Sequence, residues 1–178
     1  YPVAMLALQQ GDAAGARSQL EKLLKSDFPD KSAVHFFLGQ LEEEEKKPDL
    51  ALDHYRLVTA GDQYIAARGR AAQILLRQGK LEEARELLHT TRGGTPAEKI
   101  QLILAEAQLL REAGRGDESY ALLEAALAKQ PDNQELLYET ALAAERQGKP
   151  QVLEQHLGHL PKLKPDHAHA LNAFGYSL

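Results

Sequence analysis

The chain has 178 residues, of which 43% are hydrophobic and only 6% aromatic, and its formal net charge at pH 7 is −5. This acidic balance argues against a general nucleic-acid binder, because such proteins need a basic surface. No apolar run approaches the roughly 20 residues that span a bilayer. The lack of cysteine excludes disulfides and thiolate zinc sites, and it leaves cytosol and periplasm both open.

The predicted elements are all helices, since no stretch shows the alternation of a strand. Thr95 and Glu98 predict a capping box with Pro96 at the first helical position. Asp132 and Glu135 predict a second capping box at the next helix pair. The helices expected in chain order cover residues 1–10, 12–25, 32–46, 49–60, 63–78, 81–91, two segments within 100–131, one segment from 134, and then 150–163 and 166–178.

A two-helix unit recurs along the chain. Units begin near residues 32, 65, 100, 134 and 168, at spacings of 33 to 35 residues. Small residues allow two helices to approach closely, while larger apolar neighbours fill the space around the contact. In the first helices the small residues are Gly39, Ala72, Ala107, Ala141 and Gly175. In the second helices the same position holds Ala16, Ala51, Ala84, Ser119 and then Leu153. The corners hold Gly11, Gly79, Gly114 and Gly148, and only the unit at Ser32 departs, with Lys46-Lys47-Pro48.

This pattern resembles the tetratricopeptide repeat (TPR) family. The resemblance covers essentially all of the chain and implies an all-α fold, an α-solenoid of antiparallel helix pairs in a right-handed superhelix. It implies about four full repeats with a partial repeat at each end, in a single array over residues 1–178. We expect this array to belong to a longer chain, because its first and last units are incomplete. The link at residues 92–94, Arg-Gly-Gly, is the most flexible connection by composition.

In this family the first helix of each pair lines a concave groove. The positions that the resemblance assigns to it are Ala33, Phe36, Gln40 and Glu43, then Ala66, Gly69, Gln73 and Leu76, then Gln101, Leu104, Gln108 and Arg111, then Glu135, Tyr138, Leu142 and Glu145, and finally His169, Asn172 and Tyr176. The apolar members form a track flanked by amides and charges, which suits an extended or helical peptide. The alternative for each position is ordinary packing between repeats. The strongest candidates are Phe36, Gln40, Gln73, Leu76, Leu104, Gln108, Arg111, Tyr138, Leu142, Asn172 and Tyr176.

Other clusters favour plain interpretations. Some family members bind a terminal carboxylate through basic groove residues, but here only Arg70 stands at such a position, which disfavours that role. The acidic run at residues 42–45 indicates a solvated helix end rather than a docking patch. Arg68, Arg70 and Arg77 could meet either an acidic partner or nearby carboxylates. The histidines His156, His159, His167 and His169 favour a surface cluster over a metal site.

The sequence contains no nucleophile elbow, no phosphate-binding loop and no zinc-protease motif. We therefore expect no catalytic residue, no cofactor and no metal, and we predict that the chain is not an enzyme. The function that the family resemblance implies is an interaction scaffold whose groove binds a segment of a partner protein. The alternative is a structural or self-association segment of a larger TPR protein.

A narrower resemblance rests on LLYETALAAERQG at 136–148 and PDHAHALNAFGYSL at 165–178. These stretches are similar to the C-terminal repeats of proteobacterial outer-membrane TPR lipoproteins, although Phe174 and Ser177 depart from the usual leucine and threonine. Members of that group include periplasmic adaptors that bind a carboxyl-terminal processing protease and bring it cell-wall hydrolases. The resemblance implies a periplasmic location, with an outer-membrane anchor on a segment outside this sequence. A cytoplasmic location stays open.

Overall fold

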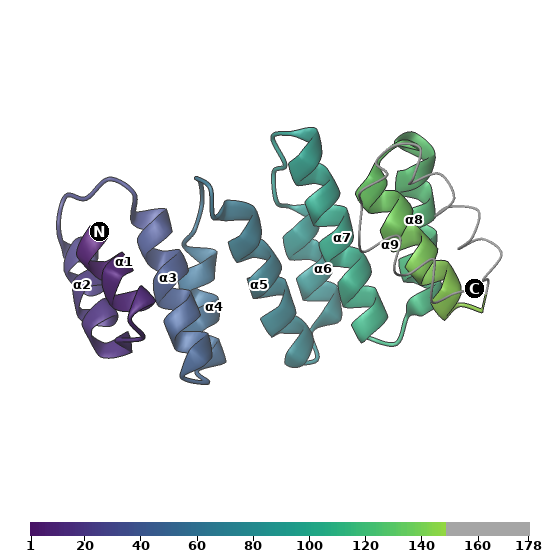
Figure 1. Cartoon of the computed structure of the whole chain (residues 1–178). Helices are drawn as coiled ribbons and strands as arrows, with labels where there is room; N and C mark the ends of the chain where they lie inside the picture. Colours follow the sequence, from purple (N-terminus) through teal and green to yellow (C-terminus); the bar gives the residue numbers. More distant parts are fainter. Residues whose placement is uncertain (149–178) are drawn as a thin grey trace. The chain divides into compact units, whose positions relative to one another are not determined.

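The computed structural model describes residues 1–148, and every regular element in that part of the chain is an α-helix (Figure 1). This confirms the all-α fold of repeated helix pairs. The helices there are α1 (Pro2–Gln9), α2 (Ala13–Lys25), α3 (Lys31–Glu44), α4 (Pro48–Arg56), α5 (Tyr64–Arg77), α6 (Leu81–His89), α7 (Pro96–Glu112), α8 (Gly116–Lys129) and α9 (Gln134–Arg146). Their ends lie within a few residues of the predicted ones. None of these helices combines the length and apolar character that a bilayer span requires.

The helices form two compact units, Tyr1–Thr91 and Arg92–Leu178. In the first unit, α1 packs on α2, α3 on α4 and α5 on α6, and each pair contacts the next through α2–α3 and α4–α5. In the second unit, α7 packs on α8, and α9 contacts both. The boundary falls at the Arg-Gly-Gly link. A single array over residues 1–178 stays a prediction.

Side-chain caps explain where several helices begin. Asp12 accepts a hydrogen bond from the Gly15 N–H at 2.9 Å, which satisfies one of the free donors of α2. Thr95 and Glu98 form the predicted capping box at α7. The second predicted box is wrong. Asn133, not Asp132, caps α9 by accepting from the Leu136 N–H at 2.9 Å, so the third helical position falls on an apolar residue.

The corner of the second pair keeps the backbone geometry of the others without their glycine. Lys46 has φ of 60°, in the left-handed region that Gly79 occupies at the next corner with φ of 78°. In both places the last turn closes in the same way, with Lys46 N–H bonded to the Glu43 carbonyl and Gly79 N–H bonded to the Leu76 carbonyl. The Lys46-Lys47-Pro48 departure is therefore one of residue type and not of backbone path.

Close helix contact at small residues holds each unit together. Gly39 on α3 lies against the ring of Tyr55 on α4, and that ring is fully buried. In the second unit the small residue on α8 is Ser119, whose hydroxyl donates to the Ala107 carbonyl of α7 at 2.7 Å. The serine thus adds a buried hydrogen bond where the three preceding repeats have alanine.

The expectation of a solvated acidic run at residues 42–45 is wrong for its first two members. Glu42 is only 3% exposed and is paired with Arg17 of α2. Glu43 is half-buried and accepts from the Tyr55 hydroxyl. Both carboxylates lie on the faces of α3 that meet neighbouring helices, so neighbouring donors replace water around them.

Candidate protein-binding groove

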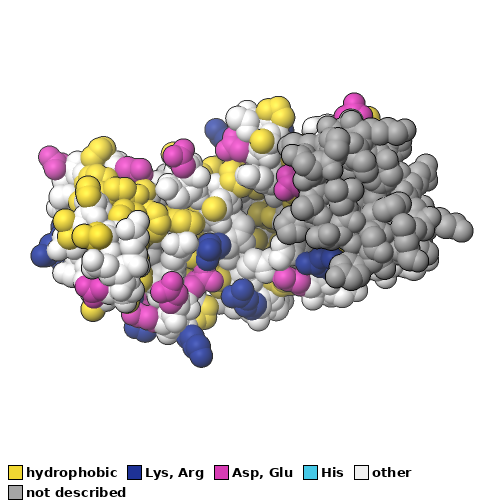
Figure 2. Space-filling view, in the orientation of Figure 1, with side chains coloured by type: hydrophobic (Ala, Val, Ile, Leu, Met, Phe, Trp, Pro, Cys, Tyr) yellow, Lys and Arg dark blue, Asp and Glu magenta, His cyan; other side chains and the backbone are white. Residues whose placement is uncertain are grey.

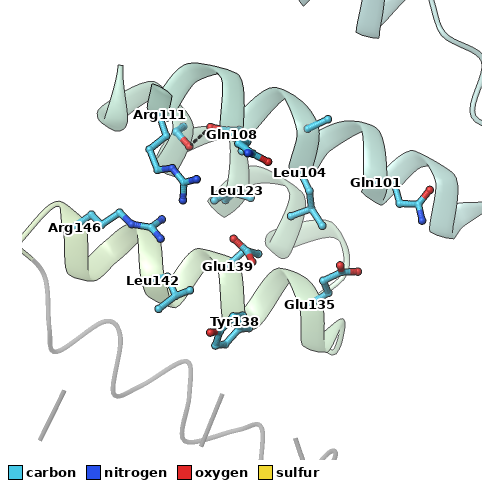
Figure 3. Close-up of a pocket in the computed structure, with 13 residues that line it drawn as sticks. Gln101, Leu104, Gln108, Arg111, Leu123, Glu135, Tyr138, Glu139, Leu142 and Arg146 are labelled. Atoms are coloured by element: carbon cyan, nitrogen blue, oxygen red, sulfur yellow. Dashed lines mark hydrogen bonds between the residues drawn. The ribbon is translucent and has the colours of Figure 1, made fainter. Parts of the chain in front are cut away.

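The second unit contains a groove of about 530 Å³ between α7 and α9 (Figure 3). The side chains that line it come mostly from these two first helices of successive repeats, with a smaller share from α8. They are Gln101, Leu104, Ala105, Ala107, Gln108 and Arg111 of α7, Ser119 and Leu123 of α8, and Glu135, Tyr138, Glu139, Leu142 and Arg146 of α9. We call this set the unit-2 groove.

Helical periodicity brings the lining of α7 onto one face. Gln101, Leu104, Gln108 and Arg111 follow one another at steps of three or four residues, which is the repeat of a helix face. The face is exposed at Gln101, Gln108 and Arg111 and half-buried at Leu104. Gln108 also donates to Glu112 at 3.2 Å. The polar groups of α7 are therefore accessible in this groove.

The middle of the unit-2 groove is lined by apolar side chains together with one carboxylate, that of Glu139. Leu104 of α7, the buried Leu123 of α8, and Tyr138 and Leu142 of α9 supply its large apolar side chains, and Glu139 of α9 points toward α7 (Figure 3). Leu104 and Tyr138 are half-buried and also pack against the core of the unit. Such a surface can accept one apolar side chain of a partner, and the groove is already formed when no partner is bound.

The two ends of the unit-2 groove carry opposite charge. Arg111 and Arg146 lie at one end, and Gln101 and Glu135 lie at the other (Figure 3). Burial of the guanidinium and the positive charge of Arg111 lower the pKa of Arg146, and they outweigh the opposing charges of Glu139 and Glu145. The two cations are thus close enough to repel. A negative group placed between them would relieve this repulsion.

The predicted groove positions of the first unit are placed differently. Phe36 is only 8% exposed and packs against Phe37 and Tyr55, with ring centroids 5.4 Å and 6.0 Å away. Its ring therefore serves internal packing, the alternative weighed for each position. Gln40, Gln73 and Leu76 are half-buried. A separate cavity of about 400 Å³ is lined by Glu43, Lys46, Pro48, Ile74, Arg77 and Gln78.

Two of the three arginines on α5 lie close to a carboxylate of their own unit. Arg70 lies 3.3 Å from Glu43 and Arg77 lies 3.8 Å from it. Arg70 also lies over the ring of Phe36, 6.0 Å from its centroid, and Arg68 lies over the ring of Tyr64 at 5.2 Å. The sequence leaves open whether these arginines meet an acidic partner protein or nearby carboxylates. The structure shows them in contact with groups of their own unit.

Comparison with known proteins places the chain in a family. The family model of the tetratricopeptide repeat matches residues 3–65 and 104–152, which together are more than half of the chain. The chain belongs to the tetratricopeptide repeat family. TPR proteins generally mediate protein–protein interactions, and their repeats are generally non-catalytic scaffolds.

A curated relative is the TPR repeat-containing protein PA4667 of Pseudomonas aeruginosa, which is 35% identical over 146 residues. The aligned region covers 82% of this chain and 25% of PA4667, so the TPR chain spans about a quarter of that relative. Among solved structures, PilF of Pseudomonas aeruginosa has a TM-score of 0.64 at 19% identity, over 96% of this chain and 77% of that one. A thermophilic TPR protein of Thermus thermophilus has a TM-score of 0.59 at 19% identity, over 99% and 95%. At these identities the structures show the fold.

Five of the strongest TPR groove candidates come together in the unit-2 groove. They are Leu104, Gln108, Arg111, Tyr138 and Leu142, and Gln101 and Glu135 from the wider set join them. The other lining residues are not among the predicted groove positions, and they are Ala105 and Ala107 of α7, Ser119 and Leu123 of α8, and Glu139 and Arg146 of α9. Arg146 follows Leu142 by one further helical turn, a spacing that could have found it, whereas the predicted Glu145 is absent from the lining. Whether these residues bind a partner stays a prediction.

Some predicted positions lie outside residues 1–148. Among the groove candidates these are His169, Asn172 and Tyr176. The histidines His156, His159 and His167 are also outside the described residues. In the described part of this TPR chain, no three metal-ligating side chains are arranged to hold a metal ion.

A histidine pair in the first unit predicts that the stability of the fold depends on pH. The Nδ1 atoms of His35 on α3 and His54 on α4 lie 3.1 Å apart. Burial lowers the pKa of both imidazoles from the ordinary 6.5; the charge of the other histidine and of Lys31 adds to this for His35, while Glu42 opposes it for His54. Below pH 6.5 the unfolded chain therefore takes up protons that the folded chain does not. The resulting stability is present above pH 6.5 and is lost as the pH falls toward the folded-state values.

We expect the urea midpoint of the parent to fall more between pH 7.5 and pH 5.5 than that of His35→Gln/His54→Gln. Glutamine keeps a hydrogen-bonding side chain at both positions but does not titrate, so the difference isolates the imidazoles. Equal losses in parent and variant would show that other groups govern the acid response.

Proposed function

We propose that this TPR chain is a non-catalytic interaction segment whose unit-2 groove binds a segment of a partner protein. The observation that carries the proposal is the groove itself, an apolar centre with accessible polar groups from α7 and α9 at both ends. Peptide-binding surfaces combine apolar pockets with a few placed polar groups, which is the composition found here.

We further propose that the chain works in the bacterial periplasm, as part of an adaptor that brings cell-wall hydrolases to a carboxyl-terminal processing protease. The support for this narrower role is the resemblance of residues 136–148 and 165–178 to outer-membrane TPR lipoproteins, together with the similarity to a TPR protein of a proteobacterium. In this role the parent protein would be held at the outer membrane.

A pull-down from a bacterial envelope extract tests both levels. Leu104→Glu/Leu142→Glu places two charges in the apolar centre of the groove and should reduce the amount of captured partner at least tenfold, since each buried carboxylate must be desolvated when the partner binds. Mass spectrometry of the captured proteins tests the adaptor role, for which a processing protease or a wall hydrolase is the expected catch.

The matched control is Leu50→Glu/Leu57→Glu, which makes the same change at two leucines of the first unit that are 49% and 55% exposed. It should leave capture unchanged. Circular dichroism melts of all three proteins separate lost binding from lost folding, and Leu142→Glu alone serves if the double variant is unfolded. Equal capture by parent and groove variant would contradict the proposal.

The alternative, a self-association segment, is favoured by one observation. Val3 and Leu6 of α1 are 59% and 52% exposed, and hydrophobic side chains gather over the first helix pair in Figure 2. Exposed apolar groups of this kind can mark an interface. Under this alternative, Val3→Glu/Leu6→Glu would lower the mass measured by light scattering, and the groove variant would leave capture unchanged.

A further inference from the structure

Among the described residues, no carboxylate is in direct contact with the two arginines at the cationic end of the unit-2 groove. Within residues 1–148, the structure shows no direct ion pair or hydrogen bond of the Arg111 or Arg146 guanidinium, and the charges of Glu139 and Glu145 act on Arg146 without such a contact. The two side chains come from different helices and both line the same end of the groove. Two guanidinium groups can hold one carboxylate between them through several charge-assisted hydrogen bonds.

The first unit shows what a satisfied arrangement looks like in this chain. There, Arg70 and Arg77 approach one carboxylate, that of Glu43, at 3.3 Å and 3.8 Å. One internal glutamate thus faces two arginines. The pair at Arg111 and Arg146 has the two cations without such a carboxylate in contact among the described residues, so we look for the missing anion on a partner.

The other end of the unit-2 groove has the opposite character. Glu135 is exposed there, beside Gln101, and Glu139 lies between it and the arginines along α9 (Figure 3). A basic side chain would be stabilised at Glu135 and destabilised at the arginine end. The groove therefore distinguishes the two ends of a charged segment as well as its apolar part.

We propose that the unit-2 groove binds an extended protein segment with an acidic side chain at Arg111 and Arg146, an apolar side chain at the centre and a basic side chain at Glu135. This specificity rests on the proposed function and names the chemistry of its partner. The acidic group of this proposal is a side chain within the segment, and a free terminal carboxylate is the other source that the experiment separates.

The geometry of α9 sets the spacing of these charges. Arg146 follows Glu135 by eleven positions, and at a rise of about 1.5 Å per residue this is about 16 Å. An extended strand advances about 3.3 Å per residue, so the acidic and basic side chains of the segment are about five residues apart. The apolar residue stands about midway between them.

A blocked peptide library tests the proposal with the full chain. The library consists of acetylated, amidated nonapeptides. Leucine is fixed at the central position, and each remaining position carries glycine, serine, glutamate, glutamine or lysine. After capture on the immobilised chain, glutamate should be enriched over glutamine about fivefold on one side of the leucine. Lysine should be enriched over glutamine on the other side, at a spacing of about five residues from the glutamate.

Three variants assign the preference to named groups. Arg111→Gln/Arg146→Gln should abolish the enrichment of glutamate and keep that of lysine. Glu135→Gln should weaken the enrichment of lysine and keep that of glutamate. Arg56→Gln, at an exposed arginine of the first unit, should change neither.

Absence of any glutamate enrichment overturns the proposal, and so does an enrichment that survives the double arginine variant. A second library has a free terminal carboxylate and contains no glutamate. If it binds more tightly than the blocked library, the proposal is also overturned, because the anion in the groove would then be a chain terminus. Failure of the proposed function is seen separately. If the pull-down shows that Leu104→Glu/Leu142→Glu loses the partner, but the peptide library shows no charge preference, only the proposed specificity fails. If the library shows a charge preference but the pull-down captures no partner, the proposed function is contradicted instead.

Discussion

Gly39→Ala should lower the free energy of unfolding by about 2 kcal/mol, because added side-chain volume meets a filled site. A Cβ atom at this position would lie 2.6 Å from Cε1 and 2.7 Å from Cδ1 of Tyr55. The tyrosine has nowhere to move, since its side chain is fully buried and its hydroxyl is bonded to Glu43. Overpacking a filled core costs about 1–3 kcal/mol, and the better helix propensity of alanine returns only about 1 kcal/mol.

Gly69→Ala makes the same change where there is open space. Gly69 lies inside α5, and nothing lies within 4 Å of the Cβ atom that the substitution adds. Here the propensity gain acts alone, so the variant should be more stable than the parent by about 1 kcal/mol. Urea unfolding of both variants measures the difference. A neutral Gly39→Ala would refute the packing at the α3–α4 contact, and a destabilising Gly69→Ala would contradict the open space at α5.

Arg17→Met should lower the free energy of unfolding by about 3 kcal/mol, because it leaves a buried carboxylate without its partner. Glu42 has a side chain only 5% exposed, and the side chain of Arg17 is 24% exposed. Arg17 also bonds to Glu45 at 2.8 Å, so one arginine of α2 holds two carboxylates at the C-terminal end of α3. Removal of the cation leaves Glu42 desolvated and uncompensated.

The double variant Arg17→Met/Glu42→Leu should return to within about 1 kcal/mol of the parent, since apolar groups of similar size replace a buried ion pair at little cost. One oxygen of Glu42 already lacks a hydrogen-bond partner among the described residues, which favours this recovery. The control is Arg56→Met, at a pair with Glu83 that is 3.1 Å long and exposed on both sides, where the loss should be below about 1 kcal/mol. If the double variant is as unstable as Arg17→Met, the carboxylate is not the cause.

The fold of this chain can be predicted because its signals repeat. Small residues such as Gly39 and Ala107 recur at matched positions, so an error at one position is corrected by the others. Caps depend on one or two residues, and there the sequence allows competing choices. Asp132 and Asn133 are both good capping residues. The structure shows that Asn133 is the residue that caps α9.

The site can be predicted in part for a different physical reason. Helical periodicity places Leu104, Tyr138 and Leu142 on facing surfaces, which a pattern can find. Whether a side chain on such a surface is open or covered depends on its neighbours from other helices. Phe36 is covered by Tyr55, and Glu42 by Arg17, and neither neighbour can be identified from a spacing of three or four residues.

The central claim is that the unit-2 groove holds a partner protein, and site-specific photo-cross-linking tests it most directly. Tyr138→benzoylphenylalanine places a light-activated group in the groove, and Leu57→benzoylphenylalanine places the same group at a leucine that is 55% exposed on the first unit. After irradiation in an envelope extract, we predict a covalent adduct with a different protein from position 138 and none from position 57. Adducts of equal yield from both positions, or an adduct from position 138 only with a second copy of this chain, would contradict the account.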